Sequence, residues 1–331
     1  MTPRHGFLLG KFMPLTLGHC HLIDGALARC ERLTVMVCSV RREPIDGHLR
    51  YRWVREVYGA RASVLHVTEE VPSYPHEHPD FWAIWRDLIH RHVPDPIDVV
   101  FTSEDYGDRL AAEVGAAAHV CIDRDRSAVP VSATRVREDP LGCWEYLPEC
   151  VRPYYAKRIL VTGPESTGKT TLARQLAEHY ATSWVPEQAR DYADGVAELT
   201  YGDLSAIAVR QLEAEEEAAR RANRLVFCDT DLVTTEIYAR EYFGRCPRFV
   251  ERLADERRYD LALLCDIELP WQPDPHRTLG DRRREFFDRF RAELDSRRAP
   301  YALVRGAGDA RLARAVASVD TALRAWSGYS A

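Results

Sequence analysis

The sequence predicts an α/β protein of two tandem domains, each built on a parallel sheet. Short apolar segments alternate with helical patterns, and this alternation occurs twice along the chain. The apolar segments lack a strict polar–apolar alternation, as expected of strands covered by helices on both faces. The length of 331 residues is also enough for two ordinary domains, each with its own core.

The expected elements follow one another in a regular order. In the first half of the chain we expect strands at 7–10, 33–38, 63–67, 97–102 and 118–122, with helices at 19–31, 50–60 and 80–92. In the second half we expect strands at 158–162, 183–185, 225–228, 261–265 and 301–304. Pro148 and Pro153 interrupt the pattern between the two halves. We therefore place the domains at residues 1–152 and 153–331.

Composition excludes several functional classes. The net charge of −6 offers no basic surface for nucleic acid, and no apolar run approaches the roughly 18–20 residues that span a bilayer. Nine cysteines without a CxxC pair are typical of buried thiols in a reducing compartment. The acidic stretch that follows Gln211 is typical of a solvated helix face. We expect a cytoplasmic protein without nucleic-acid or membrane partners, and these patterns indicate neither a monomer nor a homo-oligomer.

The stretch GKFMPLTLGHCHLI lies between the first expected strand and the first expected helix. Ligands of open parallel sheets bind beyond the carboxyl ends of the strands, where this loop lies. Gly10 and Gly18 permit close backbone approach, and Pro14 stiffens the turn between them. Thr16 and His19 are three residues apart at a helix entrance, so we expect both side chains to point at one anion, which the helix N-terminus also attracts.

This loop resembles the nucleotidylyltransferase signature GxFxPxHxGH, with threonine where histidine is commoner. A second stretch, VSATRVRED at 131–139, resembles the closing motif ISxTxxR of the same superfamily, whose residues embrace the β- and γ-phosphates of ATP. The resemblance implies a Rossmann-like nucleotidylyltransferase domain, in which a substrate phosphate attacks the α-phosphate of ATP and Mg²⁺ helps to clamp it. The residues implied in ATP binding are Gly10, Phe12, Pro14, Gly18, Ser132 and Thr134, and those implied in catalysis are Lys11, Thr16, His19 and Arg137.

The stretch GPESTGKT at 163–170 fits the P-loop pattern GxxxxGK[ST], directly after an expected strand and before a helix. Its backbone N–H groups would cradle phosphates, Lys169 would reach the β- and γ-phosphates, and Thr170 would ligate Mg²⁺. The second domain is therefore expected to be a P-loop kinase. The residues expected to contact ATP there are Gly163, Glu165, Ser166, Thr167, Gly168, Thr170 and Thr171.

Acidic residues follow the next two expected strands of the second domain. A kinase of small alcohols needs one carboxylate to accept the hydroxyl proton and another near Mg²⁺. Glu187 and Asp229 are the candidates, with Asp231 as a further one, and each could instead be a helix cap. Arg277 and Arg283 lie in a proline- and arginine-rich stretch that is expected to form a lid over the phosphate, or else an exposed surface loop.

The order of the two phosphate loops resembles the NadR family of bifunctional nicotinamide-nucleotide adenylyltransferases and ribosylnicotinamide kinases. The stretches VPSYP, FWAIW, FTSED, WEYLPECVRPYY and CDTDLVTT share this resemblance. It implies that the second domain phosphorylates nicotinamide riboside (NR) to the mononucleotide (NMN), and that the first domain joins NMN to AMP from ATP, giving NAD and pyrophosphate. Core packing competes with a substrate-stacking role for the aromatic residues. The substrate-binding candidates are Trp82, Trp85, Trp184, Arg190, Asp191, Tyr192 and Asp231.

Three alternatives bear on this interpretation. Thr16 leaves open an active kinase whose first domain binds nucleotide but catalyses weakly, whereas intact Lys169 and Thr170 argue against a non-catalytic nucleotide sensor. The HEH stretch at 76–78 lacks a third ligand that would make it a metal site. Some family members carry a DNA-binding helix-turn-helix before the first domain, and a first strand at about Phe7 leaves no room for one, so we expect no such role.

Overall fold

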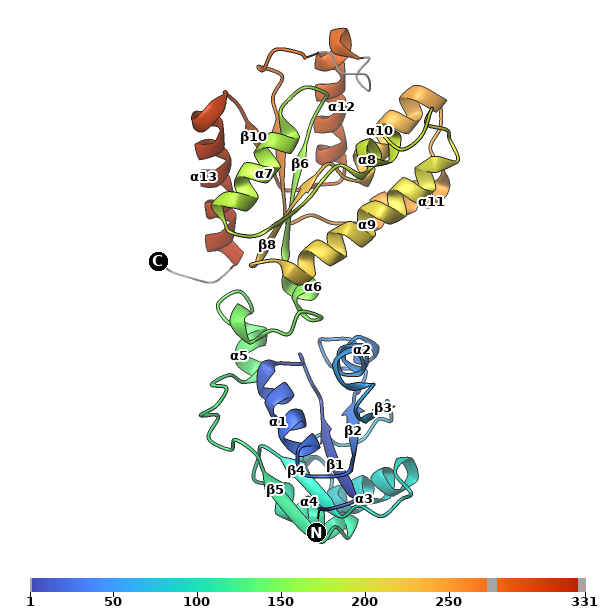
Figure 1. Cartoon of the computed structure of the whole chain (residues 1–331), viewed down its shortest axis with the longest axis vertical. Helices are drawn as coiled ribbons and strands as arrows, with labels where there is room; N and C mark the ends of the chain where they lie inside the picture. The colour runs from blue at the N-terminus through green and yellow to red at the C-terminus, as the bar shows by residue number, and fades with distance from the viewer. Residues whose placement is uncertain (1, 273–278, 327–331) are drawn as a thin grey trace. The chain divides into compact units, whose positions relative to one another are not determined.

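The computed structural model describes residues 2–272 and 279–326, and the chain divides into two compact units, Met1–Val151 and Arg152–Ala331. The sequence places this division one residue later. Each unit contains a five-stranded sheet in which all strand pairs are parallel (Figure 1). The predicted fold class is confirmed.

The first unit has the strand order β3-β2-β1-β4-β5. Its strands are β1 (His5–Gly10), β2 (Arg32–Cys38), β3 (Ser63–Val67), β4 (Val99–Thr102) and β5 (Ala118–Cys121). Its helices are α1 (Leu17–Leu27), α2 (Gly47–Tyr58), α3 (Phe81–His92), α4 (Gly107–Val114) and α5 (Ala133–Glu138), with short 3₁₀ turns at Pro75–Glu77 and Trp144–Tyr146.

Helices cover both faces of this sheet. Phe7 and Met36 pack on one face against Leu88 of α3 and Leu110 of α4. Right-handed crossovers place α1 and α2 on the opposite face. The direction of strand progression reverses between β1 and β4, which makes the carboxyl ends of these two strands the point where open α/β sheets bind ligands.

The second unit has the strand order β10-β9-β6-β8-β7. Its strands are β6 (Lys157–Thr162), β7 (Ser183–Val185), β8 (Leu225–Asp229), β9 (Leu261–Cys265) and β10 (Tyr301–Val304). Its helices are α6 (Arg152–Tyr155), α7 (Lys169–His179), α8 (Gln188–Ala193), α9 (Asp203–Arg221), α10 (Leu232–Phe243), α11 (Arg248–Glu256), α12 (Arg283–Ser296) and α13 (Gly308–Trp326), with a 3₁₀ turn at Gly280–Arg282.

The strand β6 shows how this second sheet is covered. Ile159 and Val161 point to one face, where they pack with α7 and α13. Leu160 points to the other face, where it packs with Ile237 of α10 and Phe286 of α12. Figure 1 labels α7 and α13, and α10 and α12, around this sheet. Because both faces are buried, the strands carry nearly continuous apolar runs.

Helix α9 corrects one expectation from the sequence. We expect the acidic stretch after Gln211 to be solvated. Glu213, Glu216 and Glu217 are indeed exposed, but Glu215 is fully buried and Gln211 is 3% exposed. The Glu215 carboxylate accepts hydrogen bonds from Arg257 (2.5 and 2.8 Å), from the Tyr259 hydroxyl (2.7 Å) and from the Gln211 amide (3.0 Å). A buried carboxylate persists only with such partners, and residue periodicity does not reveal them.

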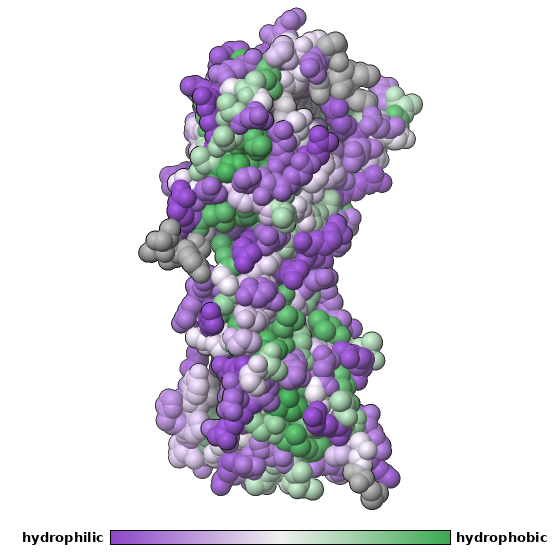
Figure 2. Space-filling model, turned by 60° about the vertical axis from the view of Figure 1, so that its left-hand side comes forward, coloured by the Kyte–Doolittle hydropathy of each residue, from purple (hydrophilic) through white to green (hydrophobic). Residues whose placement is uncertain are grey.

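The surface face drawn in Figure 2 is largely hydrophilic, with apolar residues gathered in separate patches. Within residues 2–272 and 279–326, no helix combines the length and the apolar character that crossing a membrane requires.

Candidate functional site

The first candidate site begins where Thr16 caps helix α1. The Thr16 hydroxyl accepts a hydrogen bond from the His19 backbone N–H (3.4 Å), and the Thr16 backbone N–H donates to His19 Nδ1 (3.1 Å). The Thr16 Oγ1 also lies 3.0 Å from His19 Nδ1. This reciprocal arrangement is a capping box in which histidine takes the place usually held by glutamate. The spacing of Thr16 and His19 predicts that both side chains point at an anion. Thr16 is instead buried against His19 and does not point outward.

The capping box fixes the tautomer of His19, and burial sets its protonation state. Because Nδ1 accepts the Thr16 N–H, the ring proton of neutral His19 resides on Nε2. Burial, and to a smaller extent the positive charge of Arg126, lowers the pKa of His19 to about 4. His19 is therefore a neutral N–H donor at neutral pH, next to the unpaired N–H groups of the α1 N-terminus.

The residues before Thr16 shape the floor of this loop. The Phe12 ring is buried and meets the His19 ring edge-on at 5.2 Å between centroids. Gly10 leaves room for it, because a Cβ at Gly10 would lie 3.2 Å from the Phe12 ring. Pro14 is buried beside them, and Gly18 lies in the first turn of α1. The sequence-predicted residues of this loop therefore come together around His19.

Helix α5 returns to the same loop from the other end of the domain. Ser132 caps α5 by accepting a hydrogen bond from the Arg135 N–H (3.1 Å). Arg137 donates one hydrogen bond to the Thr134 hydroxyl (3.0 Å) and another to the Met13 carbonyl, 124 residues earlier in the chain. The two motifs recognised in the sequence thus form one site, joined by Arg137.

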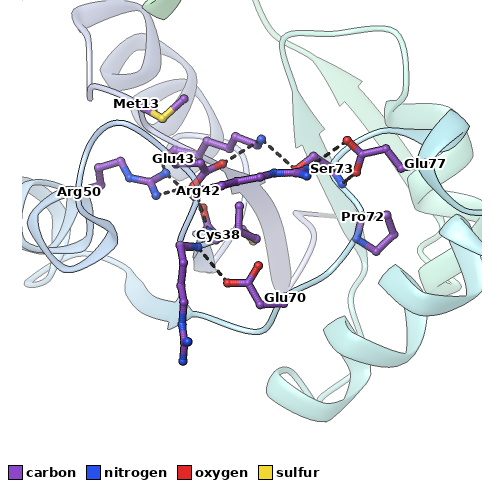
Figure 3. Close-up of polar contacts among 12 residues, drawn as sticks. Met13, Cys38, Arg42, Glu43, Arg50, Glu70, Pro72, Ser73 and Glu77 are labelled. Carbon is purple, nitrogen blue, oxygen red and sulfur yellow. Dashed lines mark hydrogen bonds and ion pairs between the residues drawn. The ribbon is translucent and has the colours of Figure 1, made fainter.

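Lys11 is held by Glu43 and Ser73, two residues that the sequence did not indicate and that Figure 3 shows close together. Its ammonium lies 2.9 Å from Glu43 Oε1 and donates to the Ser73 hydroxyl (3.1 Å). Glu43 also pairs with the fully buried Arg50 at 2.6 Å, and Arg50 donates to the Lys11 carbonyl (2.7 Å). Although burial opposes it, hydrogen bonding to Lys11 and Arg50 lowers the pKa of Glu43. No local motif surrounds Glu43, so the sequence does not mark it as a residue of this site.

Both tryptophan candidates of this domain lie on the core face of the sheet. Trp82 and Trp85 are partly buried against the cluster that contains Leu88 and Leu110. The Trp85 indole N–H donates to the Pro72 carbonyl (2.9 Å), and Arg109 lies over the Trp82 ring at 5.7 Å. Core packing thus explains much of their contact surface.

In the described part of the chain, no group of three His, Cys, Asp or Glu side chains could hold a metal, the HEH stretch included.

The second candidate site is the loop between β6 and α7. Gly163 has a φ of 136°, and a Cβ there would lie 2.9 Å from the Cys265 carbonyl oxygen, so only glycine fits. Gly168 caps α7 in the left-handed conformation. The Lys169 ammonium donates to the Pro164 carbonyl (2.9 Å), and the Thr167 hydroxyl donates to the same oxygen (2.8 Å). Thr171 lies exposed in the first turn of α7. The loop has the shape of a phosphate cradle, with its lysine folded back onto it.

Asp229 is the carboxylate that faces this loop. It is fully buried at the end of β8, and its Oδ2 accepts a hydrogen bond from Thr170 (2.5 Å). Burial and the neighbouring Glu187 raise the pKa of Asp229 to about 6, against the opposing effect of Lys169. Its Oδ1 has no hydrogen-bond partner among the described residues. An unpartnered carboxylate oxygen beside a threonine hydroxyl is a donor set that suits Mg²⁺.

Glu187 and Arg190 complete the surroundings of Asp229. Glu187 precedes α8, and its Oε2 lies 3.8 Å from Arg190 Nε. Both act electrostatically on Asp229, as does Lys169. Asp191 follows in the exposed first turn of α8. The structure therefore groups Glu187, Arg190, Lys169 and Thr170 around one buried carboxylate.

Three other candidates of the second domain lie in different surroundings. Asp231 caps α10 by accepting from the Thr234 N–H and hydroxyl (both 2.8 Å), and burial raises its pKa to about 6. The Tyr192 hydroxyl donates to Asp203 (2.7 Å), which ties α8 to α9. Trp184 packs with the core on the α7 and α13 face. These contacts give all three a role in the fold itself.

The chain on either side of residues 273–278 attaches to the phosphate loop. Gln272 N–H donates to the Ser166 hydroxyl (2.7 Å), and Leu279 N–H donates to Glu165 (3.4 Å). Arg283 donates to the Ser166 carbonyl (3.3 Å), which places this lid candidate beside the loop. Arg277, the other lid candidate, lies outside the described residues.

Two further residues near the P-loop carried no sequence signal. Arg311 of α13 is 4% exposed and donates to the Thr167 carbonyl (2.6 Å) and to the Gly306 carbonyl (3.3 Å). Tyr238 stacks on Phe286, and burial together with the charges of Glu165 and Glu187 raises its pKa well above the usual value. Both belong to helices whose apolar periodicity resembles that of any core helix, so sequence inspection passed over them.

These two sites define the class of protein. One open sheet has a loop that enters a helix at its carboxyl edge, and the other has a P-loop beside a buried carboxylate. Together they are typical of a nucleotide-metabolising enzyme with a kinase-like P-loop domain. A family model described as an AAA domain matches residues 158–311.

Relatives identify the family. The trifunctional NAD biosynthesis/regulator protein NadR of Escherichia coli (strain K12) is 30% identical over 311 residues, which cover 85% of this chain and 74% of that protein. The protein of the same name from Salmonella typhimurium is 30% identical over 303 residues, covering 83% and 72%. The chain belongs to the NadR family.

Solved structures share the fold. A crystal structure of NadR protein in complex with NAD and AMP-PNP has a TM-score of 0.74 at 21% identity, covering 99% of this chain and 97% of that chain. A crystal structure of NadR protein in complex with NR has a TM-score of 0.77 at 22% identity, covering 99% and 98%. The likeness in fold therefore extends over nearly the whole chain.

Proposed function

We propose that this protein is a bifunctional enzyme of NAD salvage. The second domain would transfer the γ-phosphate of ATP to nicotinamide riboside, and the first would join the resulting NMN to AMP from a second ATP, releasing pyrophosphate. The NadR name of the relatives supports a role in NAD biosynthesis, and the ligands of the solved NadR structures are the expected substrates, products or their analogues.

In the kinase step, we assign Mg²⁺ to Thr170 and Asp229. The unpartnered Oδ1 of Asp229 supports this assignment. Glu187 then remains as the group that accepts the proton of the attacking hydroxyl, because it is the second carboxylate near Asp229. Lys169 exchanges the Pro164 carbonyl for the β- and γ-phosphates, and Arg283 lies where it can cover the transferring group.

In the adenylyl step, the attacking group is an NMN phosphate oxygen that is already anionic. No protein base is needed, so catalysis consists of positioning and charge stabilisation. The neutral His19 would donate its Nε2–H to a phosphate oxygen at the α1 N-terminus, where the unpaired backbone N–H groups add further donors. Arg137 and Lys11 would contribute positive charge.

One observation supports the proposal most: each domain has, at the carboxyl edge of its own sheet, a loop that enters a helix N-terminus, a geometry suited to binding phosphate. We further propose that the protein works in the cytoplasm, since its cysteines are unpaired and mostly buried thiols, which suit a reducing compartment.

The test is incubation of the purified protein with Mg-ATP and nicotinamide riboside, with products separated by chromatography. NMN should appear first, followed by NAD and an equal amount of pyrophosphate. Accumulation that stops at NMN would instead support a kinase whose first domain binds nucleotide without efficient catalysis.

Two variants separate the activities. Lys169→Ala should abolish NMN formation but still convert supplied NMN to NAD. Lys157→Ala is its matched control, because it loses a partly exposed ion pair with Asp260 and a contact over the Trp326 ring but no group of the P-loop. His19→Ala should stop the sequence at NMN, with His21→Ala, two residues further along the same helix, as control. If either active-site variant impaired both steps equally, the assignment of one step to each domain would fail.

A further inference from the structure

The segment between β5 and α5 lies along helix α1. At one end, a Cβ built at Gly25 would lie 3.0 Å from the Cδ1 of Ile122. At the other end, a Cβ at Gly18 would lie 3.8 Å from the Cγ1 of Val131. The segment from Ile122 to Val131 therefore runs along α1, from Gly25 in its C-terminal half to Gly18 in its first turn, next to His19.

Asp123 holds this loop in one conformation. Its carboxylate accepts hydrogen bonds from the Ala128 N–H (3.0 Å), the Val129 N–H (3.3 Å) and the Ser127 hydroxyl (3.1 Å). These bonds lower the pKa of Asp123, the Ala128 N–H most of all. Arg126 sits inside the turn with a φ of 51°, a left-handed conformation that is unfavourable for a residue with a side chain. The loop thus presents Arg126 in a fixed place at some conformational cost.

Arg126 is less engaged than the other cations around the first phosphate site. Among the described residues its guanidinium has one ion pair, to Glu104 at 3.7 Å, and the two side chains are 45% and 59% exposed. Such a long, exposed pair is worth little. By contrast, Arg137 is bonded to Met13 and Thr134, and Lys11 is bonded to Glu43 and Ser73. The charge of Arg126 also reaches His19, whose pKa it lowers.

We propose that Arg126 is a catalytic residue of the first domain that binds the pyrophosphate portion of ATP. Its guanidinium leaves Glu104 and forms charge-assisted hydrogen bonds to the β- and γ-phosphates beside His19. This inference rests on the proposed adenylyl transfer. In that step an NMN phosphate oxygen forms a bond to the α-phosphorus, the bond from the α-phosphorus to the bridging oxygen breaks, and pyrophosphate leaves with the electron pair. No proton moves, and Arg126 stabilises the charge that accumulates on the leaving group.

The experiment compares Arg126→Ala, Arg126→Lys and Arg124→Ala in the full-length protein. Arg124 is the matched control, because it lies in the same loop and is similarly exposed but pairs with Asp105 at 2.5 Å. Arg126→Ala should lower kcat of NAD formation by about 10²–10³-fold, the usual cost of losing an electrostatic donor to the transition state. The kcat of Arg126→Lys should lie between those of Arg126→Ala and the unsubstituted protein, since lysine keeps the charge without the bidentate geometry. Arg124→Ala should stay within about twofold of the unsubstituted protein.

The reverse reaction locates the effect on the substrate. With NAD and pyrophosphate supplied, Arg126→Ala should raise KM for pyrophosphate about tenfold or more, whereas KM for NMN in the forward direction stays unchanged. An unchanged KM for NMN also reports that the first domain is folded. If the unsubstituted protein makes NAD and Arg126→Ala leaves both kcat and the pyrophosphate KM unaltered, the inference is overturned. If the unsubstituted protein makes no NAD from NMN, the proposed function fails instead.

Discussion

At the first phosphate loop, Thr16 stands where nucleotidylyltransferases more commonly carry histidine. Its hydroxyl and its backbone N–H both contact His19, so this side chain acts through its neighbour. The pair leaves Nε2 of a neutral imidazole as the outward donor. In the second domain, Asp229 is likewise defined by its contacts: one oxygen is bonded to Thr170 and the other has no partner among the described residues.

Replacing Thr16 by valine should slow adenylyl transfer without affecting the kinase step. The change removes the side-chain cap of α1 and one contact to His19, worth about 1–2 kcal/mol, or roughly 5- to 30-fold in kcat. Pyrophosphate release from NMN and Mg-ATP measures it. Thr16→Ser keeps the hydroxyl and serves as the control. A valine variant as fast as the serine variant would show that the cap does not orient His19.

The raised pKa of Asp229 predicts a pH-dependent requirement for Mg²⁺ in the kinase step. Below its pKa of about 6 the carboxyl group is protonated, and Mg²⁺ must displace that proton. The apparent affinity for Mg²⁺ should therefore weaken about tenfold per unit as the pH falls below 6, and level off above about pH 7. The Mg²⁺ dependence of NMN formation at a series of pH values measures this.

The γ-phosphate of ATP titrates in a similar range, so the comparison with Asp229→Asn is decisive. The variant should bind Mg²⁺ more weakly at neutral pH and lose the part of the slope that belongs to Asp229. Equal slopes in the two proteins would exclude Asp229 as the metal ligand.

At the scale of whole elements, apolar runs predicted all ten strands of the two sheets, with ends that differ by at most two residues. Parallel strands buried on both faces carry these runs in the sequence itself. Surface assignments were weaker, as α9 shows. Its acidic stretch was expected to face solvent, but Glu215 is buried against Arg257 and Tyr259, residues from more than 40 positions away. Partners at that distance in the chain have no periodic signature.

Removing Arg257 should therefore destabilise the second domain strongly. Arg257→Met leaves the buried Glu215 carboxylate without its cation, which costs about 3–5 kcal/mol of the free energy of unfolding. Hydrogen exchange of the β8 amides reports on this domain alone. The double variant Glu215→Leu with Arg257→Met should recover only part of the loss, because it removes the unpaired charge but leaves the Tyr259 hydroxyl and the Gln211 amide without their acceptor. Arg221→Met, which removes only an exposed pair with Glu217 on the same helix, should cost less than about 1 kcal/mol. Similar costs for Arg257→Met and Arg221→Met would contradict this account.

For the molecule as a whole, the essential feature is that each domain has its own sheet, core and phosphate loop. The loop around His19 and the loop around Lys169 are each built from residues of their own unit, so we expect substitutions in one not to alter the other.

Titration calorimetry with AMP-PNP and Mg²⁺ should accordingly detect two binding sites per chain, one for each phosphate loop. Lys169→Ala should weaken one of them and leave the affinity of the other unchanged. His19→Ala should do the converse. A single site in the unsubstituted protein, or a loss of both sites in either variant, would show that the loops do not act separately.

The sequence by itself determined the two α/β domains, the order of the phosphate loops and the residues within each loop. These depend on local patterns, because buried strands, glycine-lined turns and helix entrances are encoded by residues close together in the chain. Only the tertiary structure decided which distant groups join them: Asp229 but not Asp231 faces the P-loop, Glu43 holds Lys11, and the loop that carries Arg126 runs along α1. Such choices depend on the direction in which each side chain leaves the backbone and on what packs against it. Spacing along the chain contains neither.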